Sequence, residues 1–329
     1  MNIQNMQMSG LDLSQYLETR RLFFRQIVPG DATDLVRLNA PIEVLEYTTD
    51  EPFKNEDEAR AFAKAYPAYS TPTPYGHPLG RWGIINKEDN EFIGWCGLKW
   101  HPQEKVVDLG YRIIKDHWGK GYATEAASAC IDIAFTKVKL RSLVAHAHVN
   151  NIGSQKVLLK NGCIYIKDTV EDGIPIKVYK IDNPLYTVKT IAPQKTWEVR
   201  HPVLRAGKPL ESCAFNGDEL ETTFHLGVFY DRDLVGVSTF MENPHPAFAA
   251  RQLQLRGMGV LPEYQKRGLG EMMMDKALAF AKEKNIHLLW CNAREVAVSF
   301  YKNLGFKIKG EPFDIPEIGP HHLMFKELD

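Results

Sequence analysis

Alternating apolar and polar positions predict a strand in two places, each directly before a glycine-containing turn. Residues 106–114 read Val-Val-Asp-Leu-Gly-Tyr-Arg-Ile-Ile, and residues 253–261 read Leu-Gln-Leu-Arg-Gly-Met-Gly-Val-Leu. Apolar residues at every second position indicate an extended chain with two different faces. We therefore expect both segments to be strands that lead into the turns at 117–123 and 264–270.

A helical pattern follows each turn. From Ala123 to Phe135, apolar residues recur at i, i+3, i+4, i+7, i+8, i+11 and i+12, and from Leu269 to Ala281 the pattern is nearly the same. Each pattern is the single apolar stripe of a surface helix. A further strand, at 142–149 and at 287–291, a second helix and a turn around Gly162 or Gly305 complete both halves.

The two halves are copies of one unit. Gly268 lies 147 residues after Gly121, and Gly305 lies 143 residues after Gly162, so the offsets differ by the length of one loop. Such internal similarity indicates a structural unit that occurs twice. Residues 182–194, with two prolines, break both periods. We predict two domains, residues 1–182 and 196–329, joined by a linker at 183–195.

Composition narrows the class of protein. A length of 329 residues suits two domains. Lys plus Arg number 40 and Asp plus Glu 41, a formal charge of -1 that disfavours nucleic acid as a partner. Five scattered cysteines without a Cys-x-x-Cys pair disfavour a disulfide framework or a zinc site and suit the cytoplasm. No apolar run approaches the roughly 20 residues that span a bilayer, so we expect no membrane partner.

A glycine turn that opens a helix can bind phosphate. The first N–H groups of a helix lack intrahelical partners, and glycine lets the backbone approach an anion closely. Lys266 and Arg267 add positive charge to the second turn. By spacing alone, an ordinary loop before a helix is an equally good interpretation. The spacing fits neither a Walker loop nor a dinucleotide fingerprint.

The whole arrangement resembles the GCN5-related N-acetyltransferase (GNAT) family, whose pyrophosphate loop reads [Gln/Arg]-x-x-Gly-x-[Gly/Ala]. Gln265, Gly268 and Gly270 match every fixed position, and Gly121 and Ala123 match in the first half. Trp118 stands where the family has Gln or Arg. That change, within Trp-Gly-Lys-Gly-Tyr-Ala-Thr-Glu-Ala at 118–126, and the opening 17–26 are similar to the Rim-type ribosomal-protein acetyltransferases. The second half resembles a bacterial subgroup of unassigned substrate.

The resemblance implies an α/β (α+β) fold of two tandem GNAT domains, each a mixed, mostly antiparallel sheet with splayed central strands flanked by helices. It also implies acetyl-CoA as cosubstrate, with its pantetheine arm along the strand before each turn. The implied pantetheine contacts are Tyr111, Arg112 and Ile113 in the first half and Met258, Gly259 and Val260 in the second. The implied diphosphate contacts are Gly119, Lys120, Gly121, Tyr122, Ala123 and Thr124, and Gln265, Lys266, Arg267, Gly268, Leu269, Gly270 and Glu271.

The family pattern also implies a proton donor for the leaving thiolate. In the second half this is Tyr301, four residues before Gly305, while Leu158 stands at that place in the first half. There the Rim-type branch points to Ser154 near the sulfur and to Asn151 as a cofactor contact. The matching asparagine position of the second half is Arg294, and the nearby Asn292 is the substitute that we expect to bind the cofactor.

The sequence identifies neither the general base nor the acceptor. Asp108, Glu43, Glu242 and His225 are weak candidates for a base. The leading hypothesis is acetyl transfer to a primary amine, with the second half favoured as the active one. A degenerate first half that regulates or only binds acetyl-CoA, and a purely structural tandem, are the alternatives. The amine belongs to a small molecule or to a protein N-terminus, and the chain acts as a monomer or homodimer.

Overall fold

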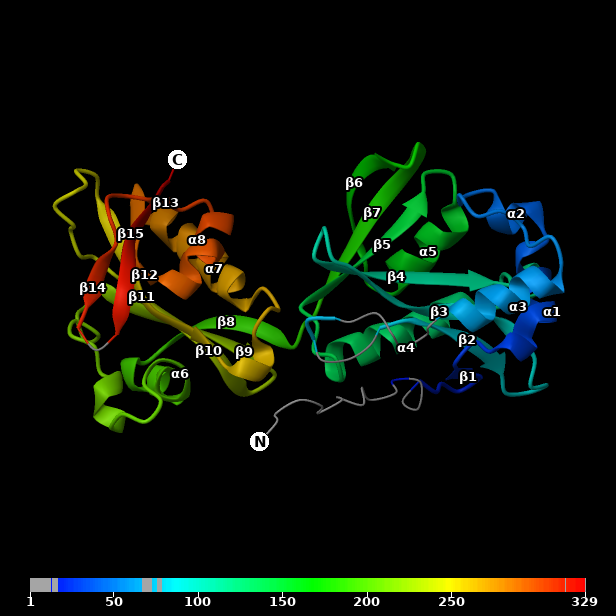
Figure 1. The fold of residues 1–329 in the computed structure, drawn as a ribbon, viewed down its shortest axis with the longest axis horizontal. Coiled ribbons are helices and arrows are strands. Elements are labelled where there is room, and N and C mark those ends of the chain that lie inside the picture. The colour runs from blue at the N-terminus through cyan, green and yellow to red at the C-terminus, as the bar shows by residue number, and fades with distance from the viewer. Residues whose placement is uncertain (1–12, 14–16, 67–72, 76–78, 317, 329) are drawn as a thin grey trace, which may run out of the picture. The chain divides into compact units, whose positions relative to one another are not determined.

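The computed structural model describes residues 13, 17–66, 73–75, 79–316 and 318–328. The chain divides into two compact units, Met1–Asn183 and Pro184–Asp329, each of which carries its own sheet (Figure 1). The opening residues 1–12 and 14–16 of the first predicted domain lie outside the described residues. None of the described helices combines the length and the apolar character needed to cross a membrane.

The sheet of the first unit has the order β1-β2-β3-β4-β5-β7-β6. Its strands are β1 (Leu22–Arg25), β2 (Arg81–Asn86), β3 (Phe92–His101), β4 (Val106–Ile113), β5 (Ser142–His148), β6 (Ile164–Glu171) and β7 (Ile174–Asp182). Its α-helices are α1 (Ala32–Asn39), α2 (Ile42–Leu45), α3 (Glu56–Ala65), α4 (Tyr122–Thr136) and α5 (Ile152–Lys160). Every neighbouring pair of strands is antiparallel except β4 with β5, so the sheet is mixed, as the resemblance implied.

Helices cover both faces of this sheet because its strands alternate between two apolar cores. Ile84 of β2 packs into the core that α4 closes, while the next residue, Ile85, packs with α1 and α3. The predicted apolar stripe of the helix after the first turn is confirmed, since Ala126, Ala127 and Cys130 of α4 are fully buried in that core.

The second unit repeats this plan in the order β13-β15-β12-β11-β10-β9-β8, with β14 beside β15. Its strands are β8 (Tyr186–Ile191), β9 (Thr223–Tyr230), β10 (Asp233–Met241), β11 (Gln252–Val260), β12 (Leu288–Arg294), β13 (Lys307–Ile308), β14 (Phe313–Ile315) and β15 (Gly319–Glu327). Its α-helices are α6 (Trp197–Leu204), α7 (Leu269–Glu283) and α8 (Val298–Asn303). Apolar residues of α7 pack into the main core, and Val199 of α6 packs against Leu234 and Val237 in a smaller one.

The two parallel strands of each unit separate soon after they meet. In the first unit, Asp108 of β4 pairs with Val144 of β5, and the last residues of β4 have no register with β5. In the second unit, β11 and β12 pair only from Gln252 with Leu288 to Gln254 with Trp290. Beyond these pairs, β4 and β11 have no register with β5 and β12 among the described residues, so the predicted splay is confirmed.

The segment predicted as a linker, residues 183–195, contains β8. This strand pairs with β9 from Tyr186 with Tyr230 to Ile191 with His225. The two prolines that suggested a loop, Pro184 and Pro193, lie just outside the strand, where their missing N–H groups cost no ladder hydrogen bond. The first residue of the segment, Asn183, belongs to the first unit, where its side chain donates to the backbone carbonyls of Phe135 and Leu140.

Candidate acyl-transfer site

Both glycine turns adopt the same backbone conformation at the start of a helix. In the first turn, Gly119 has φ +73° and Gly121 has φ +83°, and in the second, Lys266 has φ +60° and Gly268 has φ +75°. Gly121 and Gly268 are the N-cap residues of α4 and α7. Left-handed residues that alternate with right-handed ones turn successive N–H groups toward one point, which forms an anion-binding concavity. Together with the open N–H groups of the helix start, each turn can hold a phosphate.

Trp118 and Gln265 make the same contact in the two units. The indole Nε1 of Trp118 donates to the carbonyl oxygen of Ile113 at 2.7 Å, and Nε2 of Gln265 donates to that of Val260 at 3.0 Å. Ile113 and Val260 are the last residues of β4 and β11. Each side chain thus links the turn to the end of the preceding strand, so the tryptophan makes in the first unit the contact that Gln265 makes in the second.

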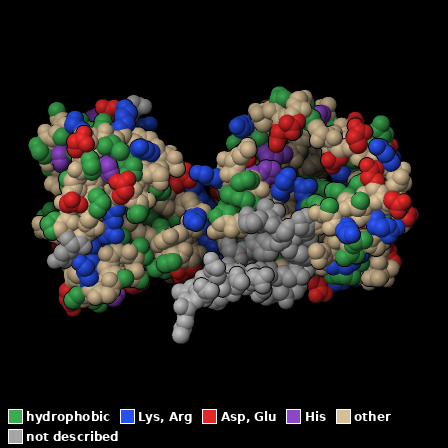
Figure 2. All heavy atoms as spheres, in the orientation of Figure 1, with side chains coloured by type: hydrophobic (Ala, Val, Ile, Leu, Met, Phe, Trp, Pro, Cys, Tyr) green, Lys and Arg blue, Asp and Glu red, His purple; other side chains and the backbone are tan. Residues whose placement is uncertain are grey.

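A cavity of about 900 Å³ lies in the first unit, between the parted strands and the first turn. Figure 2 shows this unit hollowed beside a group of histidine side chains. Among the residues that line the cavity are the predicted site residues Tyr111, Ile113, Gly119, Gly121, Tyr122, Ala123, Thr124, Asn151 and Ser154. Lys120 is absent from the lining; its carbonyl oxygen instead accepts a hydrogen bond from Arg21, which fixes the turn from outside.

An Asp–His pair lies in this cavity where β4 and β5 begin to part. Nδ1 of His146 lies 3.2 Å from Oδ1 of the buried Asp108. The Asp108 carboxylate raises the pKa of the His146 imidazole, against the lowering effect of burial. Arg81 reaches the other carboxylate oxygen at 3.6 Å. The sequence suggested Asp108 but missed His146, because their contact joins strands that are distant along the chain.

The hydroxyl groups of Tyr111 and Ser154 meet in the same cavity. Their oxygen atoms are 2.9 Å apart, and the Tyr111 hydroxyl also donates to the Ser154 carbonyl at 3.1 Å. Burial raises the pKa of Tyr111 well above its usual range, so its hydroxyl keeps its proton at neutral pH. The side chain of Asn151 caps α5, since its Oδ1 accepts from Ser154 N at 2.9 Å, which leaves its amide NH₂ group for a ligand.

In the second unit, Tyr301 lies in the core beside the parted strands. Its side chain on α8 is 8% exposed, and its ring packs against those of Phe300 and Phe306. Burial, with a smaller effect of the nearby Cys291, raises the pKa of its hydroxyl. Among the described residues, the hydroxyl has no hydrogen-bond partner.

The other residues predicted for the second unit divide between two faces of the sheet. The sulfur of Met258 lies on the side of α7, next to Gly270, whereas Gly259 lies against Val203 near the end of α6. Asn292 is exposed and Arg294 is half-buried at the end of β12. The main-chain groups of Lys266, Gly268, Leu269, Gly270 and Glu271 form the turn and the first turn of α7. The Arg267 guanidinium folds back onto the Glu263 carbonyl oxygen.

Three of the four suggested bases have other partners. Glu43 lines the first cavity but is 2.6 Å from Lys115 Nζ, and Glu242 is 2.6 Å from Arg251. His225 is buried between Thr239 and the Asp218 carbonyl. Asp108 also has partners, Arg81 at 3.6 Å and His146 at 3.2 Å, and of the four it is the one that holds an imidazole in the cavity.

Comparison with known proteins matches both units to acetyltransferase families. Residues 21–164 match the acetyltransferase (GNAT) domain family and residues 184–306 match the acetyltransferase (GNAT) family. YitI, an uncharacterized N-acetyltransferase of Bacillus subtilis (strain 168), is 40% identical over 142 residues, which are 43% of this chain and 95% of YitI. The uncharacterized N-acetyltransferase p20 of Bacillus licheniformis is 34% identical over 143 residues, 43% of this chain and 78% of p20.

A solved GNAT-family acetyltransferase from Bacillus anthracis aligns with 51% of this chain and 98% of its own length, at 21% identity and a TM-score of 0.44. The family matches and YitI identify the chemistry, since members of this family take the acetyl group from acetyl-CoA. The chain therefore belongs to the GNAT family, carries two GNAT domains in tandem, and is an acetyl-CoA-dependent acyltransferase.

Proposed function

We propose that the first unit acetylates a primary amine and that His146, held by Asp108, is its general base. The observation that carries this proposal is the cavity of about 900 Å³, which contains the phosphate-binding turn, the parted strands and the Asp–His pair together. The sequence favoured the second unit through Gln265 and Tyr301. The contacts of Trp118 remove the main reason to rank the first unit lower.

The residues present in the first unit fit acetyl-CoA. The N–H groups of residues 119–124 would hold the diphosphate, because the left-handed Gly119 and Gly121 turn them toward one point. The open edge of β4, from Tyr111 to Ile113, would hold the pantetheine arm by backbone hydrogen bonds. When bound, acetyl-CoA supplies a thioester that an amine can attack.

His146 and the hydroxyl pair would handle the two protons of the reaction. With Nδ1–H donated to Asp108, the other imidazole nitrogen is free to accept the proton that the amine loses as its nitrogen bonds to the acetyl carbon. The carbon–sulfur bond then breaks, and the thiolate needs a proton. Ser154, hydrogen-bonded to the protonated Tyr111 hydroxyl, would supply it.

The second unit is proposed as a second acetyltransferase site, with Tyr301 as its proton donor. Support comes from the conformation of its turn, which matches that of the first unit, and from the place of Tyr301 on α8, buried beside the parted strands. The alternative of a degenerate first unit rests on Trp118, Leu158 and Cys163, which stand where the second half has Gln265, Tyr301 and Phe306. Trp118 makes the contact of Gln265, and the other two are buried core residues, so none of the three speaks against cofactor binding.

Calorimetric titration of the full chain with acetyl-CoA tests both sites. We expect two molecules bound per chain, one after Gly121→Glu or Gly268→Glu, and none after both, because a carboxylate and a strained side chain would occupy the anion site. Gly173→Glu is the matched control: Gly173 also has φ +82°, in the β6–β7 turn, with open space around it. One molecule bound to the wild type and one still bound after Gly121→Glu would refute the first site.

A further inference from the structure

Three arginines that have no acidic partner among the described residues gather around the parted strands of the second unit. The guanidinium carbon atoms of Arg205 and Arg256 lie 4.9 and 5.1 Å from the centre of the Phe215 ring. Arg294, at the end of β12, is close enough to Arg205 to lower its pKa by charge repulsion. We call Arg205, Arg256 and Arg294 the arginine cluster; all three are half-buried.

The cluster lies on the face of the sheet opposite α7. A bulge in β11 changes the register from Thr239 with Arg256 to Val237 with Gly259. It places Gly257, with φ +59°, against Phe215: an added Cβ would lie 2.9 Å from the ring. The next residue, Met258, lies on the α7 side, next to Gly270. The arginines thus adjoin the strand residues implied for the pantetheine arm, but they lie across the sheet from α7.

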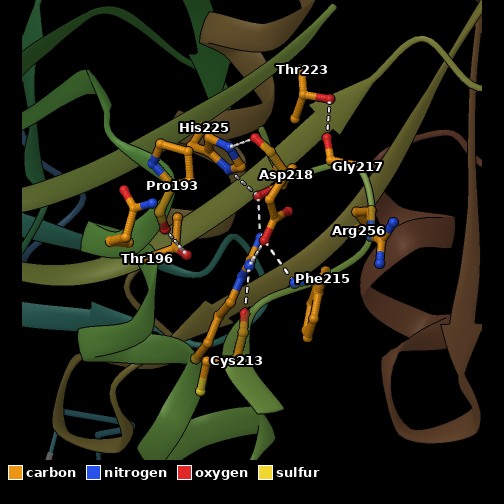
Figure 3. A network of polar contacts seen from close by, with 12 residues as sticks. Pro193, Thr196, Cys213, Phe215, Gly217, Asp218, Thr223, His225 and Arg256 are labelled. Atoms are coloured by element: carbon orange, nitrogen blue, oxygen red, sulfur yellow. Dashed lines mark hydrogen bonds and ion pairs between the residues drawn. The ribbon is translucent and has the colours of Figure 1, made fainter. Parts of the chain in front are cut away.

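A buried polar network fixes the aromatic platform of this cluster. Arg200 is fully buried, donates to the Asp218 carboxylate and to Thr239, and stacks 4.1 Å from the centre of the Phe215 ring. The same carboxylate accepts from Phe215 N at 2.9 Å, and His225 bonds Thr239 and the Asp218 carbonyl. Figure 3 shows this network, with dashed lines from Asp218 to Phe215 and to His225.

The positive charge of the cluster is not neutralised within the described residues. Asp218 is paired with Arg200, and Glu295, beside Arg294, lies against His322. Arg205 and Arg256 bond only backbone carbonyls and a methionine sulfur, and Nη2 of each has no partner among these residues. Burial lowers the pKa of both, and neighbouring arginines lower it further; for Arg256 the Asp218 carboxylate opposes this effect. Half-buried guanidinium groups that repel one another are stabilised by an anion, and a carboxylate fits their planar donors.

We propose that the acceptor of the second unit carries a carboxylate as well as its amine, and that Arg205, Arg256 and Arg294 bind this carboxylate beside the acetyl group. This inference rests on the proposed function of the second unit. The chemical class is therefore an amino acid, free or at the C-terminal end of a short peptide, rather than a polyamine.

The first unit does not share this feature. Counted along the strands, the parallel pair Asp108–Val144 takes the place of Gln254–Trp290, so His146 and His148 of β5 take the places of Asn292 and Arg294 of β12. Counted back from the later glycine turns, as in the sequence comparison, Arg294 instead matches Asn151. The two arginines of the first cavity are matched with acids: Arg81 with Asp108, and Arg112 with Asp50. A preference for carboxylates should therefore belong to the second unit alone.

The test compares matched acceptors with the full chain in a thiol-release assay. Each L-amino acid is paired with its carboxamide, and each of a set of dipeptides with its amidated form, with rates corrected for the fraction of neutral amine. We expect at least one acid to be acetylated ten times or more faster than its amide.

The arginine variants test which residues cause this preference. Arg256→Gln and Arg205→Gln should each lower kcat/KM for the acid about 10- to 100-fold, mainly through KM, and leave kcat/KM for the amide unchanged. Arg232→Gln, an exposed change in the β9–β10 turn, is the control.

Three results would contradict a carboxylate site in the second unit. Equal rates for acids and amides, no turnover of any acid, or an acid preference that survives Gly268→Glu would overturn the proposal. A loss of acetyl-CoA affinity in the arginine variants at a constant acid-to-amide ratio would assign the cluster to the cofactor instead. Failure of the second unit to bind acetyl-CoA at all would refute the proposed function itself, and calorimetry reports that separately. Dipeptides preferred over free amino acids would identify a peptide as the source of the carboxylate.

Discussion

Asp218→Asn should destabilise the second unit strongly, because it leaves a fully buried guanidinium without its counter-charge. In the wild type, Asp218 accepts hydrogen bonds from both Nη atoms of Arg200 and from Phe215 N. Asparagine has almost the same shape, but it carries no charge, and its NH₂ group would face donors. Removing one partner of a buried ion pair costs about 3–5 kcal/mol of the free energy of unfolding.

Differential scanning calorimetry of the full chain can measure this effect. For a unit of this size, each kcal/mol lowers the Tm by about 2–4 °C, so the transition of the second unit should fall by roughly 6–20 °C. The transition of the first unit should not move, because the hydrogen bonds that Asp218 makes within the described residues all lie in the second unit. Since Phe215 loses an anchor, the acid-to-amide ratio of the second unit should fall as well.

Two further variants test whether the loss of the buried Arg200–Asp218 ion pair causes the destabilisation. Asp233→Asn, an exposed change at the start of β10, removes the same charge without breaking a buried ion pair. Surface changes typically alter the free energy of unfolding by roughly 0.5 kcal/mol, so the Tm should shift by no more than about 1–2 °C. Arg200→Met combined with Asp218→Asn should recover part of the loss, because no charge then remains buried. If Asp218→Asn behaves like Asp233→Asn, the buried pair is not what holds this region together.

The remaining predictions concern the reaction. Since a base must be neutral and Asp108 raises the pKa of His146, kcat/KM of the first unit should fall as the pH drops through a value above 6.5, and Asp108→Asn should move this inflection to lower pH. Trp118→Phe should weaken acetyl-CoA binding to the first unit about fivefold, near 1 kcal/mol for the lost bond to Ile113. Tyr301→Phe should slow turnover by the second unit more than it weakens acetyl-CoA binding.

Each of these predictions has its contrary result. An unchanged pH profile after Asp108→Asn would remove the Asp–His pair from the mechanism. Trp118→Gln should keep most of the affinity, as the contact of Gln265 implies, and a loss equal to that of Trp118→Phe would show that the indole ring rather than its donor matters. An unaltered kcat after Tyr301→Phe would leave proton donation to another group.

The fold was predictable because its signals are local. Strand alternation, helical stripes and the two glycine turns each lie within some fifteen residues, and the nearly constant offset between the copies joined them into a repeat. The strand β8 inside residues 183–195 was missed for the same reason. Pro184 and Pro193 are strong local signals for a loop, but the pairing of β8 with β9 is decided by residues some 40 positions away.

The two sides of the acyl-transfer site differ in how they are encoded, and this explains what the sequence could and could not reveal. The cofactor side depends on backbone groups, so it leaves glycines at fixed spacing, and even the change to Trp118 keeps the same hydrogen bond. The acceptor side depends on side chains that the fold brings together, such as His146 with Asp108, or Arg205 with Arg256. Because each such residue comes from a different strand or loop, no short motif records it. Two copies of one backbone can therefore keep a common cofactor and differ in the acceptor that we propose for each, since the arginines of the first cavity are paired with acids and those of the arginine cluster are not.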